Sequence, residues 1–470
     1  MTPLPRSTPS AQQVDAGGVL ALLDALDAAG TEMHSLMVLR HGHVVAEGWW
    51  APYTAERRHL LYSLSKSFTS TAAGFAVAEG LLDLDDTVLS HFPELDAEVT
   101  DPRSRAMRVR HVAAMASGHT GETLQRAVAV DPVDVVRGFL LTPPEAEPGT
   151  VFAYNQPCTF TLGRIVQRRS GHRLTEYLRP RLLDPLGIGE VGWLRHGEDD
   201  MGFTGLHART EDIARLGQLY LQRGRWDGVQ LLDEEWVADA TRAHVSNERE
   251  PNPDWQQGYG FQFWMSRHGY RGDGAYGQFC LVLPEQDAVV ATTAATEDMQ
   301  TVLDAVWAHL LPALGAHPDA DAETELAQRL QQLRLDPVAV GSGPAAPDAT
   351  PRELTVVDAD DRTPPGLTAV TVQAGEELVR LTLHQRTSRL EVGAAPGDWL
   401  VGEAAGRQGP VPVAASAGWP QAGTLQVEVA FLETPHRLVV TCSEADGTAT
   451  ARWRTVPLHQ GELDTLRCPD

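Results

Sequence analysis

The sequence of 470 residues lacks both a long hydrophobic run and an excess of positive charge. No window approaches about 18 consecutive apolar residues, so no segment predicts a membrane-spanning helix. Lysine and arginine total 38 against 63 aspartates and glutamates, which gives a formal net charge of −25. A surface of this sign repels phosphate backbones and anionic lipid. We therefore expect neither nucleic acid nor a membrane as a partner.

Cysteine is scarce, and the N-terminal segment has no signal-peptide pattern. The four cysteines, at positions 158, 280, 442 and 468, lie far apart and show no metal-binding spacing. The segment MTPLPRSTPSAQQVDAGG has one arginine and no apolar stretch of the kind that signal peptides carry. These features predict a cytoplasmic protein with buried or free thiols. We expect neither a metal nor a cofactor.

Lysine is almost absent. Of the 38 lysine and arginine residues, one is a lysine, Lys66. A lysine is needed where an amine must lose its proton, because a buried ammonium can become neutral whereas a guanidinium stays charged. The isolation of Lys66 therefore makes it a candidate catalytic base.

A serine precedes this lysine by three positions, in the stretch YSLSKSF. The residues from Ser63 to Glu79 are rich in alanine and long apolar side chains and are followed by Gly80, a pattern typical of a helix with a C-terminal stop. Residues three apart share one face of a helix, so the Ser63 hydroxyl and the Lys66 amine can meet. At the start of the helix, free N–H groups would favour a developing oxyanion.

The rest of the chain divides into two regions and a linker. We expect one domain over 1–316, a helix and Pro/Gly/Ala linker over 317–351, and a β domain over 352–470. The last region shows eight short stretches of apolar–polar alternation, which indicate a small antiparallel barrel or sandwich. These stretches are ELTVV, LTAVTV, ELVRLTL, SRLEVGA, WLVGEA, TLQVEVAFL, HRLVVTC and TATARWRTV.

A Tyr-Asn-x segment begins at Tyr154, about 90 residues after the Ser63-x-x-Lys66 pair. With these motifs the first 316 residues resemble the penicillin-binding-protein-like serine hydrolases, the superfamily of class C β-lactamases, family VIII esterases, D-aminopeptidases and nylon-oligomer hydrolases. The resemblance extends in order through YSLSKSFTSTAAGFAVAEGLLDLDD, VRHVAAMASG, PGTVFAYNQ, DPLGIGEVGW, GLHARTEDIARLGQLYLQRGRWDG and GDGAYGQFCLVLPEQDAVV. It implies an α+β fold, an antiparallel sheet flanked by helices. The tail is similar to the lipocalin-like barrels of some D-aminopeptidase and peptide-cyclase relatives.

The resemblance also implies the role of each site residue. Ser63 would be the nucleophile and Lys66 its general base. Tyr154 would share the base's work and protonate the leaving group, with its pKa lowered by the nearby amine. The backbone N–H groups of Ser63 and Ala275, the latter on an edge strand, would form the oxyanion hole. The substrate-binding residues would be Gln156, Asp273, Gly274 and Tyr276.

Two positions depart from the family pattern. Gln156 stands where relatives have Asn or Ser, and its longer amide would hold Lys66 or a substrate carbonyl. The third motif, Lys-Thr-Gly or His-x-Gly in lactamases and transpeptidases, aligns with Gly272-Asp273-Gly274. An anion at Asp273 should weaken the binding of β-lactams and C-terminal carboxylates, although Arg271 could restore a cation.

The sequence thus predicts a serine hydrolase that cleaves small esters or amides through an acyl-enzyme. A β-lactamase, a D,D-peptidase or a D-aminopeptidase is one alternative, and an acyl-transferring peptide cyclase is another. A catalytically silent ligand-binding module is the alternative outside enzymes. The oligomeric state, the natural substrate and the job of the tail are left open.

Overall fold

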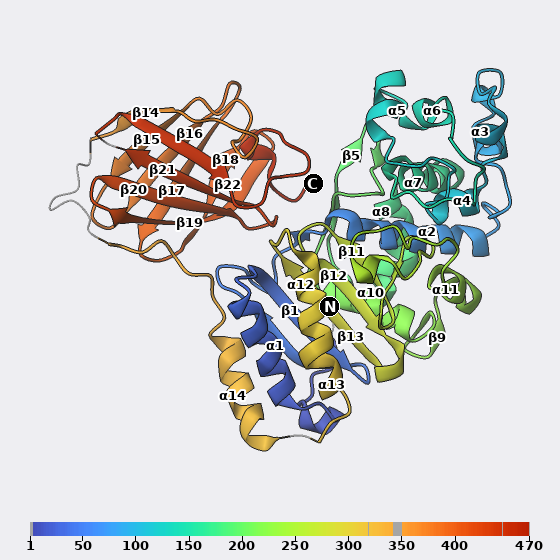
Figure 1. Ribbon diagram of the computed structural model, residues 1–470, viewed down its shortest axis with the longest axis horizontal. Coiled ribbons are helices and arrows are strands. Elements are labelled where there is room, and N and C mark those ends of the chain that lie inside the picture. The colour runs from blue at the N-terminus through green and yellow to red at the C-terminus, as the bar shows by residue number, and fades with distance from the viewer. Residues whose placement is uncertain (1–2, 318, 342–349, 444, 470) are drawn as a thin grey trace.

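A six-stranded antiparallel sheet forms the centre of the larger part of the computed structural model (Figure 1), which describes residues 3–317, 319–341, 350–443 and 445–469. Its strands run in the order β10-β11-β12-β13-β1-β2. Their bounds are β1 Met33–Arg40, β2 His43–Trp49, β10 Trp264–Met265, β11 Tyr270–Gly274, β12 Gln278–Leu283 and β13 Ala288–Ala294.

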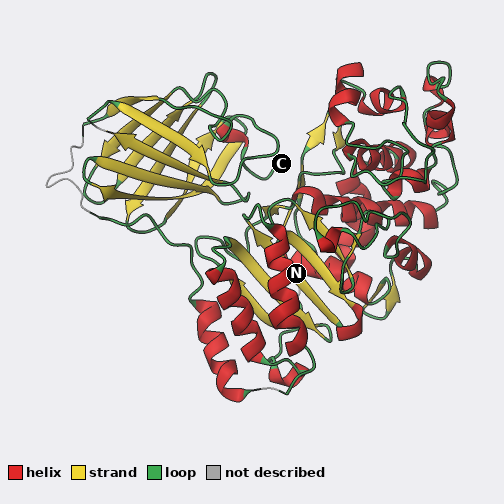
Figure 2. Cartoon of the chain, in the orientation of Figure 1, coloured by secondary structure: helices red, strands yellow, loops and turns green. Residues whose placement is uncertain are grey.

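Helices cover both faces of this sheet, as Figure 2 shows. On one face lie α1 (Ala16–Ala28) and α12 (Met299–Ala305), and α14 (Ala320–Gln331) packs against α1 and against β2. On the other face α10 (Thr210–Leu221) crosses β12 and β13. Since neither face meets water, β1, β12 and β13 are buried at every residue. The predicted antiparallel sheet flanked by helices is confirmed.

A helical lobe stands beside the sheet and packs on α2 (Ser65–Ala78). Its central helix, α7 (Gln156–Ser170), contacts α2 along one face, and Gly171 ends it in a left-handed conformation with φ 73°. The other helices of the chain are α3 Pro102–Ala106, α4 Val109–Ala113, α5 Leu124–Val130, α6 Val135–Leu140, α8 Leu174–Leu178, α9 Asp184–Leu186, α11 Glu234–Ala240 and α13 Leu311–Ala313. Short strands complete this part: β3 His59–Leu60, β4 Gly192–Trp193, β5 Arg195–His196, β6 Asp199–Asp200, β7 Leu206–Ala208, β8 Arg225–Trp226 and β9 Val229–Gln230.

The C-terminal region is a closed β-barrel. Strands follow the order β17-β16-β15-β14-β22-β21-β20-β19, and β17 pairs with β19 to close the ring, while β18 lies outside on β19. Their bounds are β14 Arg352–Val356, β15 Ala369–Ala374, β16 Val379–His384, β17 Arg389–Pro396, β18 Leu400–Gly406, β19 Gly409–Gln421, β20 Thr424–Phe431, β21 Arg437–Ser443 and β22 Thr448–Trp453. The barrel alternative is therefore correct and the sandwich alternative is wrong. The likeness to lipocalins stays a prediction, and residues 342–349 of the expected linker lie outside the described residues.

The barrel has one strand more than the eight predicted. The missed strand is β19, the longest of the barrel, with the sequence GPVPVAASAGWPQ. Proline, glycine, alanine and serine are poor strand formers, so this segment carries no strand signal of its own. Its pairing with β17, β18 and β20 outweighs that preference, and its side chains from Val413 to Trp419 are buried.

The barrel is docked on the part of the chain that resembles serine hydrolases in sequence (the hydrolase-like part, residues 3–317). The contacts are made by the turn between β20 and β21 and by the C-terminal segment. Tyr62 and His436 form a hydrogen bond of 2.6 Å between hydroxyl and Nε2, and Arg437 forms an ion pair with Glu32. The backbone N–H of Leu60 donates to the carbonyl of Glu433 at 2.8 Å. These contacts hold the barrel next to the strand that leads into the turn containing Ser63.

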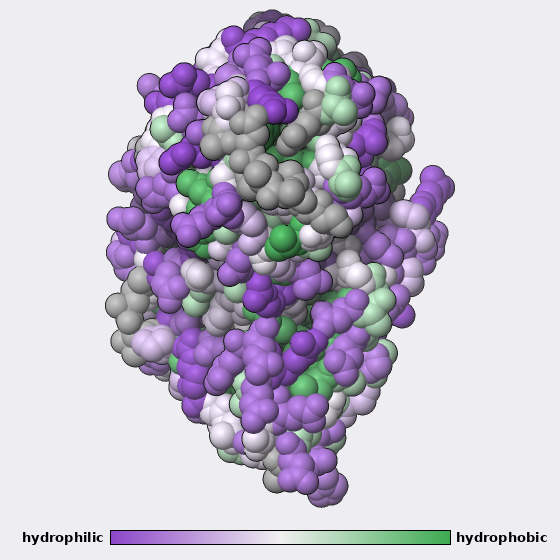
Figure 3. All heavy atoms as spheres, turned by 90° about the vertical axis from the view of Figure 1, so that its left-hand side faces the viewer, coloured by the Kyte–Doolittle hydropathy of each residue, from purple (hydrophilic) through white to green (hydrophobic). Residues whose placement is uncertain are grey.

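The barrel end of the molecule is mostly hydrophilic, with small separate hydrophobic areas (Figure 3). Within the described residues, no helix is both long and apolar enough to span a bilayer.

Candidate functional site

Ser63 lies in the 3₁₀ turn Tyr62–Leu64 that leads into α2. Strand β11 presses against this turn. A Cβ atom added to Gly274 would lie 2.0 Å from the Leu61 carbonyl oxygen, and one added to Gly272 would lie 2.5 Å from Leu64 Cδ1. Glycine at both positions therefore lets the strand end approach the serine closely.

The Lys66 amine makes three hydrogen bonds. Its Nζ lies 3.0 Å from Ser63 Oγ, 2.7 Å from Gln156 Oε1 and 2.8 Å from the Phe203 carbonyl oxygen. The first distance results from the i, i+3 spacing at the start of the helix. The second fits the expectation that the longer amide of Gln156 reaches the lysine.

Lys66 is almost completely buried, with 1% of its surface exposed. Burial penalises the ammonium form and lowers the pKa of Lys66 to about 7, although the negative charges of Asp273 and Glu122 oppose the shift. A neutral amine is therefore well populated near pH 7.

Tyr154 stacks beside the lysine. The Lys66 Nζ lies 4.8 Å from the centre of the Tyr154 ring, and Trp264 stacks on the same tyrosine with 5.2 Å between ring centres. Burial and the charge of Asp273 raise the pKa of Tyr154 well above its ordinary value, while hydrogen bonding with Ser63 offsets the rise in part. The expectation of a lowered phenol pKa is wrong, because desolvation dominates and the amine faces the ring. The phenol is protonated at neutral pH.

Asp273 is paired, which the sequence did not resolve. Arg271 Nε donates to Asp273 Oδ2 at 3.0 Å, and the Arg271 guanidinium lies 4.3 Å above the Trp255 ring. Arg271 also donates from Nη1 to the Asp254 carbonyl oxygen at 2.8 Å and to Ser266 Oγ at 2.6 Å. With no exposed surface, Arg271 neutralises Asp273 from behind and does not present a cation to a ligand.

A cleft of about 390 Å³ opens in front of Ser63. Of the predicted residues, Ser63, Tyr154, Gln156, Asp273 and Ala275 line it. Ala275 follows the last residue of β11 and begins the turn to β12, so it lies just past the strand on which it was expected. The other lining residues are Glu250, Pro251, Asn252, Trp255, Trp264, Glu297, Asp298, Met299 and Leu458.

Two predicted substrate-binding residues are not among those that line the cleft. Gly274 is packed against the turn that holds Ser63, and a Cβ atom at this position would meet the Leu61 carbonyl. Tyr276 donates its hydroxyl hydrogen bond to the Val456 carbonyl and packs its ring edge-on against Tyr62. Its contacts are thus with the C-terminal segment that follows the barrel, and it helps to dock that segment.

Leu458 of this C-terminal segment forms part of the cleft wall, and sequence reasoning missed it. The segment is held in place by the Val456 contact just described and by a 3.4 Å contact between the Leu458 backbone N–H and the Tyr62 hydroxyl. A residue almost 400 positions from Ser63, outside every motif, gives no signal in the sequence.

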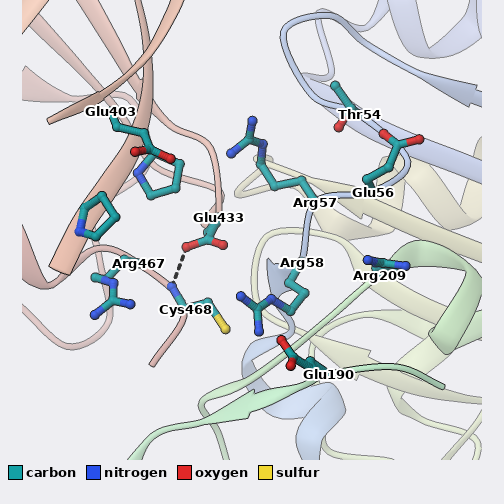
Figure 4. Close-up of a pocket in the computed structure, with 12 residues that line it drawn as sticks. Thr54, Glu56, Arg57, Arg58, Glu190, Arg209, Glu403, Glu433, Arg467 and Cys468 are labelled. Carbon is teal, nitrogen blue, oxygen red and sulfur yellow. Dashed lines mark hydrogen bonds between the residues drawn. The ribbon is translucent and has the colours of Figure 1, made fainter. Parts of the chain in front are cut away.

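A second cavity, of about 430 Å³, lies between the two parts of the chain. Figure 4 shows Arg57 and Arg58 on the hydrolase-like side facing Arg467 on the barrel side, with Glu433 between them accepting a hydrogen bond from the Cys468 backbone. Arg57 Nε is buried with no hydrogen-bond partner among the described residues. Among the described residues that line this cavity there is no serine, lysine or tyrosine.

Comparisons with known proteins agree with this geometry. The family model described as Beta-lactamase matches residues 21–313, more than half of the chain. The 6-aminohexanoate-dimer hydrolase of Paenarthrobacter ureafaciens is 27% identical over 290 residues, which cover 57% of this chain and 74% of that protein. The lovastatin esterase of Penicillium rubens is 27% identical over 186 residues, which cover 35% of this chain and 46% of the esterase.

One solved structure resembles the fold over both parts of the chain. The structure described as SurE has a TM-score of 0.50 and 20% identity, and the match covers 93% of this chain and 98% of that one. At this identity the likeness concerns the fold alone. The family match, with an Ser-x-x-Lys pair at the cleft, identifies the chain as a member of the β-lactamase family of serine hydrolases.

Proposed function

We propose that the chain hydrolyses small esters or amides through an acyl-enzyme on Ser63, with neutral Lys66 as the general base. The hydrogen bonds of Lys66 carry this proposal. The Gln156 and Phe203 oxygens are pure acceptors, so they take both N–H groups of a neutral amine. The lone pair is then left for Ser63, whose hydroxyl is the remaining neighbour at 3.0 Å.

Acylation follows from this arrangement. As Lys66 takes the proton, Ser63 Oγ forms a bond to the substrate carbonyl carbon, and the negative charge moves to the carbonyl oxygen. The backbone N–H groups of Ser63 and Ala275 are proposed to bind that oxyanion. When the tetrahedral intermediate collapses, the bond to the leaving alcohol or amine breaks, and the leaving group takes up a proton.

Tyr154 is proposed as the donor of that proton. Its raised pKa supports a neutral phenol that donates its proton to the leaving group and then regains one from the Lys66 ammonium. It does not support a phenolate that acts as a second base beside Lys66. Water then repeats the sequence on the acyl-enzyme: Lys66 accepts its proton, hydroxide adds to the ester carbon, and Ser63 leaves with a proton.

Intact-protein mass after brief exposure to a fluorophosphonate tests the nucleophile. We expect one adduct on the wild type and on Ser443→Ala, a barrel serine, and none on Ser63→Ala. p-Nitrophenyl butyrate and a chromogenic cephalosporin are followed in parallel. Turnover of the ester with little turnover of the cephalosporin supports an esterase-like enzyme, and rapid cephalosporin turnover supports a β-lactamase. No adduct and no turnover would overturn the proposal in favour of a binding module.

A nucleophile competition separates hydrolysis from acyl transfer. The reaction of p-nitrophenyl butyrate is followed with and without an added primary amine. For a hydrolase, the ratio of butyrate formed to p-nitrophenol released is the same in both cases. A transferase such as a peptide cyclase would instead divert most of the acyl group to the amine, and that outcome would overturn hydrolysis as the main reaction.

A further inference from the structure

The charges around the Ser63 cleft are of one sign. Four of the residues that line it carry carboxyl groups, namely Glu250, Asp273, Glu297 and Asp298, and no lysine, arginine or histidine is among the described residues of the lining. The cleft already contains the nucleophile, so these carboxyl groups surround a position that a substrate must occupy.

Three of the four carboxyl groups are already engaged by the protein. Asp273 is paired with Arg271, and Glu297 is paired with Arg362 at 2.5 Å. Asp298 caps α12 by accepting from the Thr301 backbone N–H at 3.3 Å, and it also accepts from the Thr301 hydroxyl at 2.7 Å. Arg271 and Arg362 offset two of these charges, and the fold explains the geometry of all three carboxyl groups.

Glu250 is different, because its carboxylate has no ion pair or side-chain hydrogen bond within the described part of the chain. The residue is half-buried, and this burial raises the pKa of its carboxyl group. A partly desolvated carboxylate without a partner, on the wall of the substrate cleft, is stabilised when a cation binds next to it.

Among the described residues that line the cleft, none carries a cation that could bind a substrate carboxylate. Arg271 is fully buried behind Asp273 and stacked on Trp255. Lys66 is buried and loses its charge near pH 7. A negatively charged substrate therefore meets only like charge at the cleft wall.

We propose that this cleft selects substrates carrying a positively charged amine near the scissile ester or amide bond, with Glu250 as the specificity-determining residue. The inference rests on the proposed hydrolase function and names its substrate class. Carboxylate-bearing substrates of the same size and shape are disfavoured.

Two matched ester series test the inference at 20 mM NaCl. The first varies the acyl chain: p-nitrophenyl 6-aminohexanoate, the neutral heptanoate of equal length, and the pimelate monoester with its terminal carboxylate. The second varies the leaving group: butyrylthiocholine against its neutral isostere, 3,3-dimethylbutyl thiobutyrate. In at least one series we expect kcat/KM for the cation to exceed that of the neutral ester by about tenfold, the effect of one close charge pair. The pimelate monoester should be slower than the heptanoate.

Salt and a pair of variants identify the cause. Raising NaCl to 500 mM should shrink the preference, because exposed charges are screened. Glu250→Gln should reduce the ratio of cationic to neutral kcat/KM by several-fold. Glu376→Gln, which removes a carboxylate from an exposed barrel turn and gives the same net charge, should leave that ratio unchanged.

The outcomes separate this inference from the proposed function. If the wild type hydrolyses none of the esters in either series, the proposed function fails. If both neutral esters are hydrolysed and neither series favours the cation, only the inference is overturned. An equal loss of preference in Glu376→Gln would show that net charge, rather than Glu250, is the cause, and would overturn the assignment of this residue.

Discussion

The Ser63 cleft and the cavity between the barrel and the hydrolase-like part are both lined by charged residues, but arginines line the cavity, whereas the charged residues that line the cleft are acidic and a lysine lies behind Ser63. The interdomain cavity is lined by Arg57, Arg58, Arg209 and Arg467, which stay charged at any physiological pH (Figure 4). The cleft has the chain's one lysine at its base, hydrogen-bonded to Ser63 and buried so that its pKa falls to about 7.

This difference fits the proposed roles, in which arginines supply fixed charge and Lys66 accepts a proton. Arginine serves wherever a fixed charge is sufficient, including the buried Arg271. Burial acts on the two residues differently. It drives a lysine to the neutral form, whereas a guanidinium keeps its proton and requires a partner such as Asp273.

Exchanging lysine and arginine between the two sites should have the largest effect and tests whether only the cleft needs a cation that can lose its proton. Lys66→Arg keeps the charge but removes the group that can lose a proton. We expect kcat/KM for p-nitrophenyl butyrate to fall by about 10²–10⁴-fold, the usual contribution of a general base. Arg58→Lys, the reverse exchange in the interdomain cavity, should leave kcat/KM unchanged. Activity of Lys66→Arg near that of the wild type would remove Lys66 from the mechanism.

The stability of Arg271 variants tests whether this buried guanidinium is needed as the charge partner of Asp273. Arg271→Met leaves the Asp273 carboxylate buried without its partner, which typically costs about 3–5 kcal/mol. Urea denaturation should show this loss in the free energy of unfolding. The double variant Arg271→Met/Asp273→Asn should regain part of it, since it removes the unpaired charge. A double variant no more stable than the single one would contradict the pairing argument.

The pH dependence of kcat/KM tests whether Lys66 acts as a neutral base. Its folded-state pKa is lowered to about 7, so the neutral base is present above that pH and is lost as the pH falls through it. We expect kcat/KM to rise about tenfold per pH unit below 7 and to level off above it. A profile that climbs steadily to pH 10 would indicate an amine with an ordinary pKa.

The motif residues of the site were predictable because each has a signal in the nearby sequence. Lys66 stands out as the one lysine, and the helix pattern after Ser63 places the two side chains on one face. The raised pKa of Tyr154 was not predictable, because it depends on burial under Trp264 and on the charge of Asp273, which other segments supply. The Arg271–Asp273 pair had a usable signal, since alternate residues of a strand share one face.

In the fold too, features encoded in the nearby sequence were predicted, and features that depend on contacts between distant segments were missed. Strands with β-branched alternation, such as β20 and β21, were predicted, whereas β19 was missed because its residues take strand form only through their neighbours. Tyr276 was assigned to substrate from its place in a motif, but the C-terminal segment covers it. Contacts made by that segment depend on how the barrel docks, which no local pattern encodes.

Truncation of Leu458 tests what this docked segment contributes to substrate binding in the cleft. Leu458 stays 57% exposed while lining the wall, so truncation should remove apolar contact with substrate without opening the core. For Leu458→Ala we expect KM for p-nitrophenyl butyrate to rise about two- to fivefold, from roughly 1 kcal/mol of lost burial, with kcat little changed. Leu400→Ala, an exposed leucine on β18, is the matched control and should have wild-type kinetics. Identical kinetics for both variants would mean that the segment borders the cleft without touching the substrate, and the barrel's contribution would then be limited to holding the Tyr62 turn in place.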